Sequence, residues 1–133
     1  DATGDLLRGQ TLLAKCNADF VVLSGDDATS RDLIAFGARG AISVTANVVP
    51  DLMSEMCESM LTEKFDRAAK LDKSISALHK ELFVEANPVP VKWALGRMGK
   101  IKFGIRLPLI SLSKKYHFQL EQAMRDSGVS LED

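Results

Sequence analysis

The sequence predicts an α/β fold in its first part and a helical region in its second part. Two short apolar runs without alternation, Phe20–Leu23 and Ala41–Val44, are typical of parallel strands that are covered on both faces. A segment with helical periodicity lies between them and ends at Gly37. A strand–helix–strand connection this short predicts a right-handed crossover between parallel neighbours. No strand pattern follows Val44, so the remaining chain is expected to be helical.

The first helices are predicted from their capping residues. Thr3 or Asp5 is a suitable N-cap for a helix that carries leucines on one side. After the first strand, Thr29 or Ser30 is the expected N-cap of a second helix, and Gly37 is its stop. Each strand runs into a polar tip, and in α/β folds the loops after strand C-termini carry the chemistry. Two such tips in succession predict the rim of an active site.

The helices of the second part are predicted from their apolar spacing. From Pro50, apolar pairs recur at helical spacing, and a second stripe follows with spacings of three and four: Ala68, Leu71, Ile75, Leu78 and Leu82. That helix should stop before Asn87, because prolines at 88 and 90 bias their predecessors away from helical geometry. A short helix over Val91–Leu95 and a last helix, capped by Ser113 and stopped at Gly128, complete the prediction.

The length and net charge of the chain exclude several classes of protein. The 133 residues correspond to one domain, and the net charge of -1 offers no positive patch for nucleic acid or an anionic membrane. The apolar runs are far shorter than the roughly 18 residues that cross a bilayer, and the first residues have no signal-peptide pattern. We therefore expect a cytoplasmic protein with neither nucleic acid nor membrane as a partner.

The cysteines and histidines lack the spacing of a metal or catalytic site. Cys16 and Cys57 lie far apart, each on the apolar side of a predicted helix, and are expected to be buried, reduced thiols. His79 is isolated late in a helix, where we expect a partly exposed side chain, and His117 is isolated as well. No catalytic residue, metal ligand or cofactor is predicted within the chain.

Four sequence motifs carry a family resemblance. DATGDL at the start, LSGDDAT and GAISVTAN at the two strand tips, and LFVEANPVPVKWAL later in the chain occur in this order. Together they resemble the dihydrodipicolinate synthase family, and the similarity extends from Asp1 to about Pro108. The resemblance implies a (β/α)₈ TIM barrel, which typically needs about 250 residues. This chain would be its C-terminal part, with the last βα units in residues 1–61 and a helical C-terminal domain in residues 62–133.

The resemblance also implies a reaction. The family is a pyruvate-dependent, class I aldolase-type lyase that condenses pyruvate with L-aspartate 4-semialdehyde to 4-hydroxy-tetrahydrodipicolinate, in lysine and diaminopimelate biosynthesis. It is commonly a cytoplasmic homotetramer, and Leu6, Leu7 and Phe36 match its interface positions. The Schiff-base lysine of the family directly precedes the DATG-like segment. We therefore expect this lysine to come from outside the chain, the N-terminal half of the barrel to be a partner, and the chain alone to be inactive.

The resemblance assigns two positions to substrate binding. Ile42 would line the pyruvate pocket through its backbone, and Gly25 would allow close approach at the preceding tip, where a Cβ would intrude. Ile42 is equally compatible with an ordinary barrel core. Asp26 and Asp27 suit either acid/base chemistry or the start of the next helix, and the second role is preferred. Thr3, Ser43, Thr45 and Asn47 either bond around the site or close turns.

Two alternatives remain open at this stage. N-acetylneuraminate lyase and keto-deoxy-sugar aldolases belong to the same superfamily, although Asp26-Asp27 and the tip formed by Val44, Thr45, Ala46 and Asn47 favour the synthase. The other alternative is a non-catalytic fragment or assembly partner, because none of the lysines lies within a predicted strand or at its tip.

Overall fold

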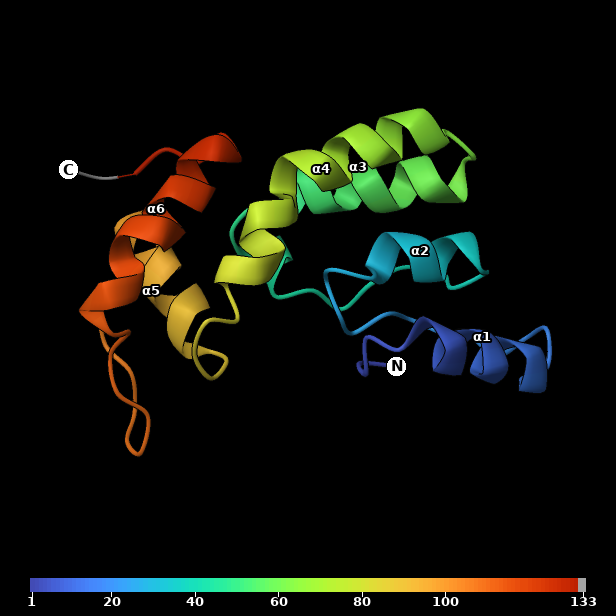
Figure 1. The fold of residues 1–133 in the computed structure, drawn as a ribbon, viewed down its shortest axis with the longest axis horizontal. Coiled ribbons are helices and arrows are strands. Elements are labelled where there is room, and N and C mark those ends of the chain that lie inside the picture. Colours follow the sequence, from blue (N-terminus) through green and yellow to red (C-terminus); the bar gives the residue numbers. More distant parts are fainter. Residues whose placement is uncertain (132–133) are drawn as a thin grey trace. The chain divides into compact units, whose positions relative to one another are not determined.

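A computed structural model describes residues 1–131 and divides the chain into two compact units. The first unit consists of residues 1–43 and 51–73, and the second consists of residues 44–50 together with the chain from residue 74 onward. Figure 1 shows the helices of both units. Helix α4, Phe65–Glu81, supplies residues to each unit, and the units are described separately below.

The first unit contains α1, α2, α3 from its second residue and the start of α4. Helix α1 spans Leu6–Lys15, α2 spans Ser30–Ala35 and α3 spans Pro50–Leu61. Gly37 has a φ of 121° directly after the α2 C-cap, so the predicted glycine stop is confirmed. The core of this unit is apolar and includes Val22, Leu33, Ile34, Ala38, Met53, Met56, Met60, Ala68 and Leu71.

The second unit is built on the end of α4 and on later helices. It adds the 3-10 turn η1 (Thr45–Asn47), α5 (Val89–Arg97), the 3-10 turn η2 (Lys114–Tyr116) and α6 (His117–Asp126). Trp93 of α5 stacks on His117 of α6 with 4.5 Å between ring centroids, and His117 Nε2 donates to the Leu112 carbonyl at 3.1 Å. The core of this unit includes Ile75, Leu78, Leu82, Val89, Val91, Ala94, Leu120 and Met124.

The helical pattern of the second half is confirmed in large part. All five residues of the predicted stripe from Ala68 to Leu82 are buried, because spacings of three and four place the first four on one face of α4 and Leu82 follows directly after the helix. Helix α5 begins two residues earlier than predicted, at Val89, since a proline in the first helical turn has no amide proton to lose there. Ser113 is the N-cap of η2 by position, as predicted, but its side chain makes no capping bond and donates to a Glu85 carboxylate oxygen instead.

The structure differs from the prediction mainly at the two expected strands. Within residues 1–131 no strand ladder forms; Phe20–Leu23 and Ala41–Val44 are represented by one parallel bridge between Ser24 and Ala41. A ladder requires repeated hydrogen bonds to a neighbour, which the apolar pattern alone does not specify. The α/β expectation thus holds only for the parallel direction of the two segments. No helix in the described part of the chain is long and apolar enough to cross a bilayer.

Candidate functional site

Two extended segments of the first unit run side by side at the predicted rim. Arg39 N donates to the Val22 carbonyl at 2.9 Å, Ser24 N donates to the Gly40 carbonyl at 2.9 Å, and Ile42 N donates to the Ser24 carbonyl at 2.7 Å. The bonds alternate in the slanted manner of parallel strands. The two segments therefore run parallel to each other at Ser24 and Ala41, as the sequence predicts.

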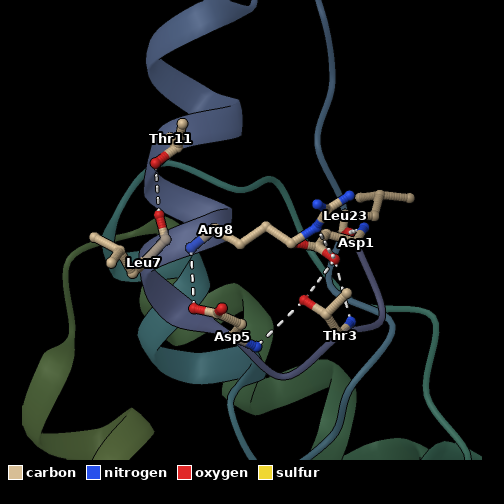
Figure 2. Close-up of polar contacts among 7 residues, drawn as sticks. All are labelled: Asp1, Thr3, Asp5, Leu7, Arg8, Thr11 and Leu23. Atoms are coloured by element: carbon tan, nitrogen blue, oxygen red, sulfur yellow. Dashed lines mark hydrogen bonds and ion pairs between the residues drawn. The ribbon is translucent and has the colours of Figure 1, made fainter.

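The first residues of the chain form a third extended segment on the other side of Ser24. Asp1 N donates to the Leu23 carbonyl at 2.8 Å, and Gly25 N donates to the Asp1 carbonyl at 2.9 Å. Figure 2 shows how Thr3 Oγ1 donates to Asp1 Oδ1 at 2.9 Å within this loop. Thr3 also accepts from Asp5 N at 3.3 Å, so its hydroxyl closes the turn that leads into α1.

Asp5 is the N-cap of α1. Its Oδ1 accepts from Arg8 N at 3.0 Å, which satisfies one of the amides left free by the helix start (Figure 2). This confirms one of the two candidate caps. Arg8 Nε also lies 3.7 Å from Asp1 Oδ1, so the first turn of α1 and the loop before it are joined by charge as well.

Gly25 lies where the segment that begins at Phe20 approaches the first residues of the chain. A Cβ at this position would lie 2.7 Å from the Ala2 Cβ and 3.2 Å from the Ala2 Cα, closer than side chains tolerate. The absence of a side chain at Gly25 is therefore explained by the neighbouring backbone. The family resemblance explains glycine at this position by a keto-acid site that a Cβ would enter. The contact with Ala2 gives a second reason, which lies within the chain itself.

Ile42 presents its backbone to Ser24 and its side chain to solvent. The side chain is 72% exposed, so the ordinary core position considered for it is not found in these 131 described residues. Its amide is already bonded to Ser24, which leaves the carbonyl as the backbone group that a ligand at this tip could use.

The two aspartates of the first tip have different surroundings. Asp26 Oδ2 accepts from Thr29 N at 3.1 Å and from Thr29 Oγ1 at 2.7 Å, just before α2. Asp27 is 2% exposed, and its carbonyl accepts from Ser30 Oγ at 2.9 Å. The preferred interpretation, that the pair shapes the start of the following helix, is supported for Asp26. Thr29 is the N-cap by position but makes no side-chain capping bond.

Cys57 of α3 lies within hydrogen-bond reach of the Ala41 backbone in the second extended segment. Burial raises the pKa of the Cys57 thiol, a backbone hydrogen bond with Ala41 opposes that shift, and the negative charge of Asp27 adds to it. Cys16 and Cys57 are both free thiols, as expected, but each is half-buried rather than buried. A raised pKa keeps Cys57 in its unreactive thiol form.

The second unit contains a polar pair that the sequence reasoning missed. Thr45 Oγ1 and His79 Nδ1 share a hydrogen bond of 2.9 Å, with Thr45 0% and His79 6% exposed. The expectation of a partly exposed His79 is wrong, because His79 lies one residue beyond Leu78 on the apolar face of α4. The only sequence signal was that position 79 falls four residues after Ile75 and three before Leu82.

Groups that could bind a metal ion or form an imine are scarce among the described residues. No cluster of His, Cys, Asp and Glu suited to a metal ion occurs in the part of the chain that the structure describes. Lys92 is half-buried, and the other lysines are exposed: Lys15, Lys64, Lys70, Lys73, Lys80, Lys100, Lys102, Lys114 and Lys115. An imine-forming lysine typically lies in a desolvated site, whereas these lysines are exposed or, at Lys92, half-buried.

Comparison with known proteins places the chain in a family. A model of the dihydrodipicolinate synthetase family matches residues 1–127. The 4-hydroxy-tetrahydrodipicolinate synthase of Marinobacter nauticus is 50% identical over 129 residues, which cover 97% of this chain and 44% of that protein. The corresponding synthase of Nitrosospira multiformis is 48% identical over 131 residues, covering 98% of this chain and 44% of that protein.

Solved structures give the same result. The chloride-inhibited dihydrodipicolinate synthase of Acinetobacter baumannii, in complex with pyruvate, matches with a TM-score of 0.94 and 47% identity over 98% of this chain and 45% of that one. The dihydrodipicolinate synthase of Aquifex aeolicus matches with a TM-score of 0.95 and 32% identity over 100% of this chain and 45% of that one. The chain thus spans less than half the length of these relatives. It belongs to the dihydrodipicolinate synthetase family.

Proposed function

We propose that this chain forms part of a pyruvate-dependent lyase that condenses pyruvate with L-aspartate 4-semialdehyde to 4-hydroxy-tetrahydrodipicolinate. The observation that carries the proposal is the 50% identity to a curated synthase over 97% of this chain. The A. baumannii relative, which was solved with pyruvate, supports the keto-acid half of the reaction. The pathway would be lysine and diaminopimelate biosynthesis, in the cytoplasm.

In this proposal the chain supplies one wall of the keto-acid site. Ile42 contributes backbone atoms, and Gly25 keeps the neighbouring tip free of a side chain. The parallel bonding of the two segments supports this role, because it brings the end of each segment to the same edge. The Schiff-base lysine would come from outside the chain, which agrees with the exposed or half-buried state of the lysines described here.

The proposal extends to architecture. Residues 1–61 would complete a (β/α)₈ barrel and residues 62–133 would form its helical C-terminal domain. Leu7 and Phe36 are exposed apolar side chains in the first unit, which suits surfaces covered by other subunits of a homotetramer.

A joined protein tests the proposal. In it, this chain follows the part of the Marinobacter nauticus synthase that precedes the matching segment. Pyruvate followed by borohydride should fix a stable adduct on one lysine, and peptide mass mapping should place that lysine in the added part. The joined protein should then consume L-aspartate 4-semialdehyde, with an N-acetylated sugar aldehyde as the comparison substrate. Turnover of the sugar instead would favour the sialic-acid lyase alternative.

The chain alone, treated in the same way, should take up no label. An adduct on an internal lysine would overturn the placement of the imine outside the chain. If the joined protein folds but takes up no label either, the non-catalytic alternative is favoured.

A further inference from the structure

We propose that Ser24 is a positioning residue for the keto-acid site, because its hydroxyl fixes the direction of the Gly25 carbonyl. The inference rests on the proposed function and adds a residue to which that function gives no role. Ser24 is 1% exposed, whereas Gly25 directly after it is exposed. Since glycine has no side chain, the exposed atoms of Gly25 belong to the backbone, where a ligand at this tip can reach them.

Among the described residues, none donates a hydrogen bond to the Gly25 carbonyl. The start of the chain bonds beside it, with Asp1 N donating to the Leu23 carbonyl at 2.8 Å and Gly25 N donating to the Asp1 carbonyl at 2.9 Å. The next bond of a parallel ladder would join Thr3 N to the Gly25 carbonyl. Thr3 N donates instead to Asp1 Oδ1 at 3.1 Å (Figure 2), so the Gly25 carbonyl stays available to a ligand.

The Ser24 hydroxyl acts on the peptide group that contains this carbonyl. Ser24 Oγ accepts from Asp26 N at 3.3 Å and donates to the Asp26 carbonyl at 3.0 Å. Asp26 N–H and the Gly25 carbonyl belong to one planar, trans peptide group and point in opposite directions, so the bond to Asp26 N also directs the carbonyl. Within residues 1–131 this is the one hydrogen bond that the peptide group makes.

The other contacts at this tip hold neighbouring groups. The bond from Gly25 N belongs to the preceding peptide group, and the bonds of Asp26 Oδ2 with Thr29 hold a side chain. Glycine tolerates several orientations of the peptide group that follows it, because no Cβ restricts its torsions. The orientation of the Gly25 carbonyl therefore depends on the Ser24 hydroxyl, which in its buried position needs these bonds itself.

An oriented carbonyl suits the chemistry proposed for the site. When an amine adds to the keto carbon of pyruvate and the adduct loses water, the imine that forms takes up one proton on its nitrogen and becomes a cation. A carbonyl dipole that is already directed at this cation stabilises it without first having to be ordered. Ser24 would thus favour the imine while touching neither pyruvate nor the lysine.

Variants of the joined protein test this inference through pyruvate alone. Ser24→Ala removes the hydroxyl, Ser24→Cys keeps the shape of the side chain but offers only a weak sulfur acceptor, and Ser24→Thr keeps the hydroxyl. The readout is the pyruvate concentration that gives half-maximal borohydride inactivation. We expect it to rise about fivefold in Ser24→Ala and in Ser24→Cys, as the loss of one buried hydrogen bond implies. Ser24→Thr should stay close to the parent.

Ser30→Ala is the matched control, because it also removes a buried hydroxyl that bonds to the backbone of this tip. Ser30 is 0% exposed, and its Oγ donates to the Asp27 carbonyl at 2.9 Å, which leaves the Gly25–Asp26 peptide group untouched. Ser30→Ala should lower thermal stability and leave the pyruvate dependence unchanged. Equal pyruvate dependence in the parent, Ser24→Ala and Ser24→Cys would overturn the inference, and so would an equal rise in Ser24→Ala and Ser30→Ala. If Ser24→Ala does not fold, Ser24→Cys decides the same question.

A second readout keeps this inference separate from the proposed function. If the joined parent forms no imine, the function fails, but amide hydrogen exchange at Asp26 N still tests the role of Ser24. This amide should exchange faster in Ser24→Ala than in the parent or in Ser30→Ala. Equal exchange in all three proteins would contradict the positioning role whatever the reaction is.

Discussion

Gly25 illustrates how one residue can be required for two reasons at once. The family resemblance explains the glycine by a ligand, whereas the geometry explains it by Ala2, whose Cβ would lie 2.7 Å from a new Cβ. The two explanations predict different compensations. Only the steric explanation is relieved by a change at Ala2.

Gly25→Ala should destabilise the joined protein by about 1–3 kcal/mol, the usual cost of overpacking a tight contact. Adding Ala2→Gly removes the nearer of the two contacts and should restore part of that loss. Thermal unfolding followed by far-ultraviolet circular dichroism measures both variants. If Ala2→Gly gives no recovery while the double variant is folded, the contact with Ala2 is not the cause.

The Cys57 thiol should make stability depend on pH. Burial raises its pKa, so the folded state holds the proton more tightly than the unfolded state does. The stabilising contribution is complete below the ordinary thiol value of 9.0 and is lost as the pH rises from there through the raised folded value. Unfolding midpoints of the joined protein, measured upward from pH 8, should fall less steeply in Cys57→Ala than in the parent. Identical slopes would contradict the shift.

His79 shows why a buried polar pair is not visible in a sequence. Its position in the apolar stripe could be read, but its partner Thr45 lies 34 positions away, and no local pattern connects the two. Ile42 and Gly25 could be placed only by resemblance. The polar residues beside them were visible, yet whether each bonds outward or closes a turn depends on tertiary geometry.

At the scale of elements, helix starts depend on single side chains. Asp5 accepts from Arg8 N at 3.0 Å and so caps α1. Asp5→Ala should cost about 1 kcal/mol of stability, because one amide of the first turn loses its partner. Asp5→Asn is the matched control, since it keeps an oxygen acceptor and should remain within a few tenths of a kcal/mol of the parent. Denaturant midpoints measure the difference; equal losses in both variants would assign the effect to charge instead of capping.

The elements also show which sequence patterns carry information. Helices α3 and α4 were predicted because their apolar spacing is set by the helix alone, and their buried faces agree. The extended segments are predicted at the right positions and in the right direction, but their three backbone hydrogen bonds form one bridge, at Ser24 and Ala41, and no ladder. Pairing depends on neighbours distant in sequence, so periodicity cannot supply it.

At the scale of the molecule, the first unit exposes apolar side chains next to the rim. Phe20, Val21 and Ile42 are each more than half exposed. Large apolar side chains gathered in this way favour association or a covering partner. The proposed barrel would supply that cover.

The chain alone should therefore bind a dye for apolar surfaces, such as anilinonaphthalene sulfonate, more strongly than the joined protein does. Val21→Ser should lower dye binding by the chain alone and have little effect in the joined protein. Leu107→Ser, at a position of the second unit that is 85% exposed against 61% for Val21, is the control. Strong and equal dye binding by the chain with and without the added part would argue against a barrel that covers these residues.

The stacked pair of Trp93 and His117 has a practical consequence for all such measurements. The chain has one tryptophan and one tyrosine, and Trp93 and Tyr116 both belong to the second unit. Intrinsic emission from this polypeptide consequently monitors the surroundings of α5 and α6 and is blind to the rim. A fluorophore introduced near α1 would be needed to observe the other unit, and a difference between the two signals on heating would reveal melting in separate steps.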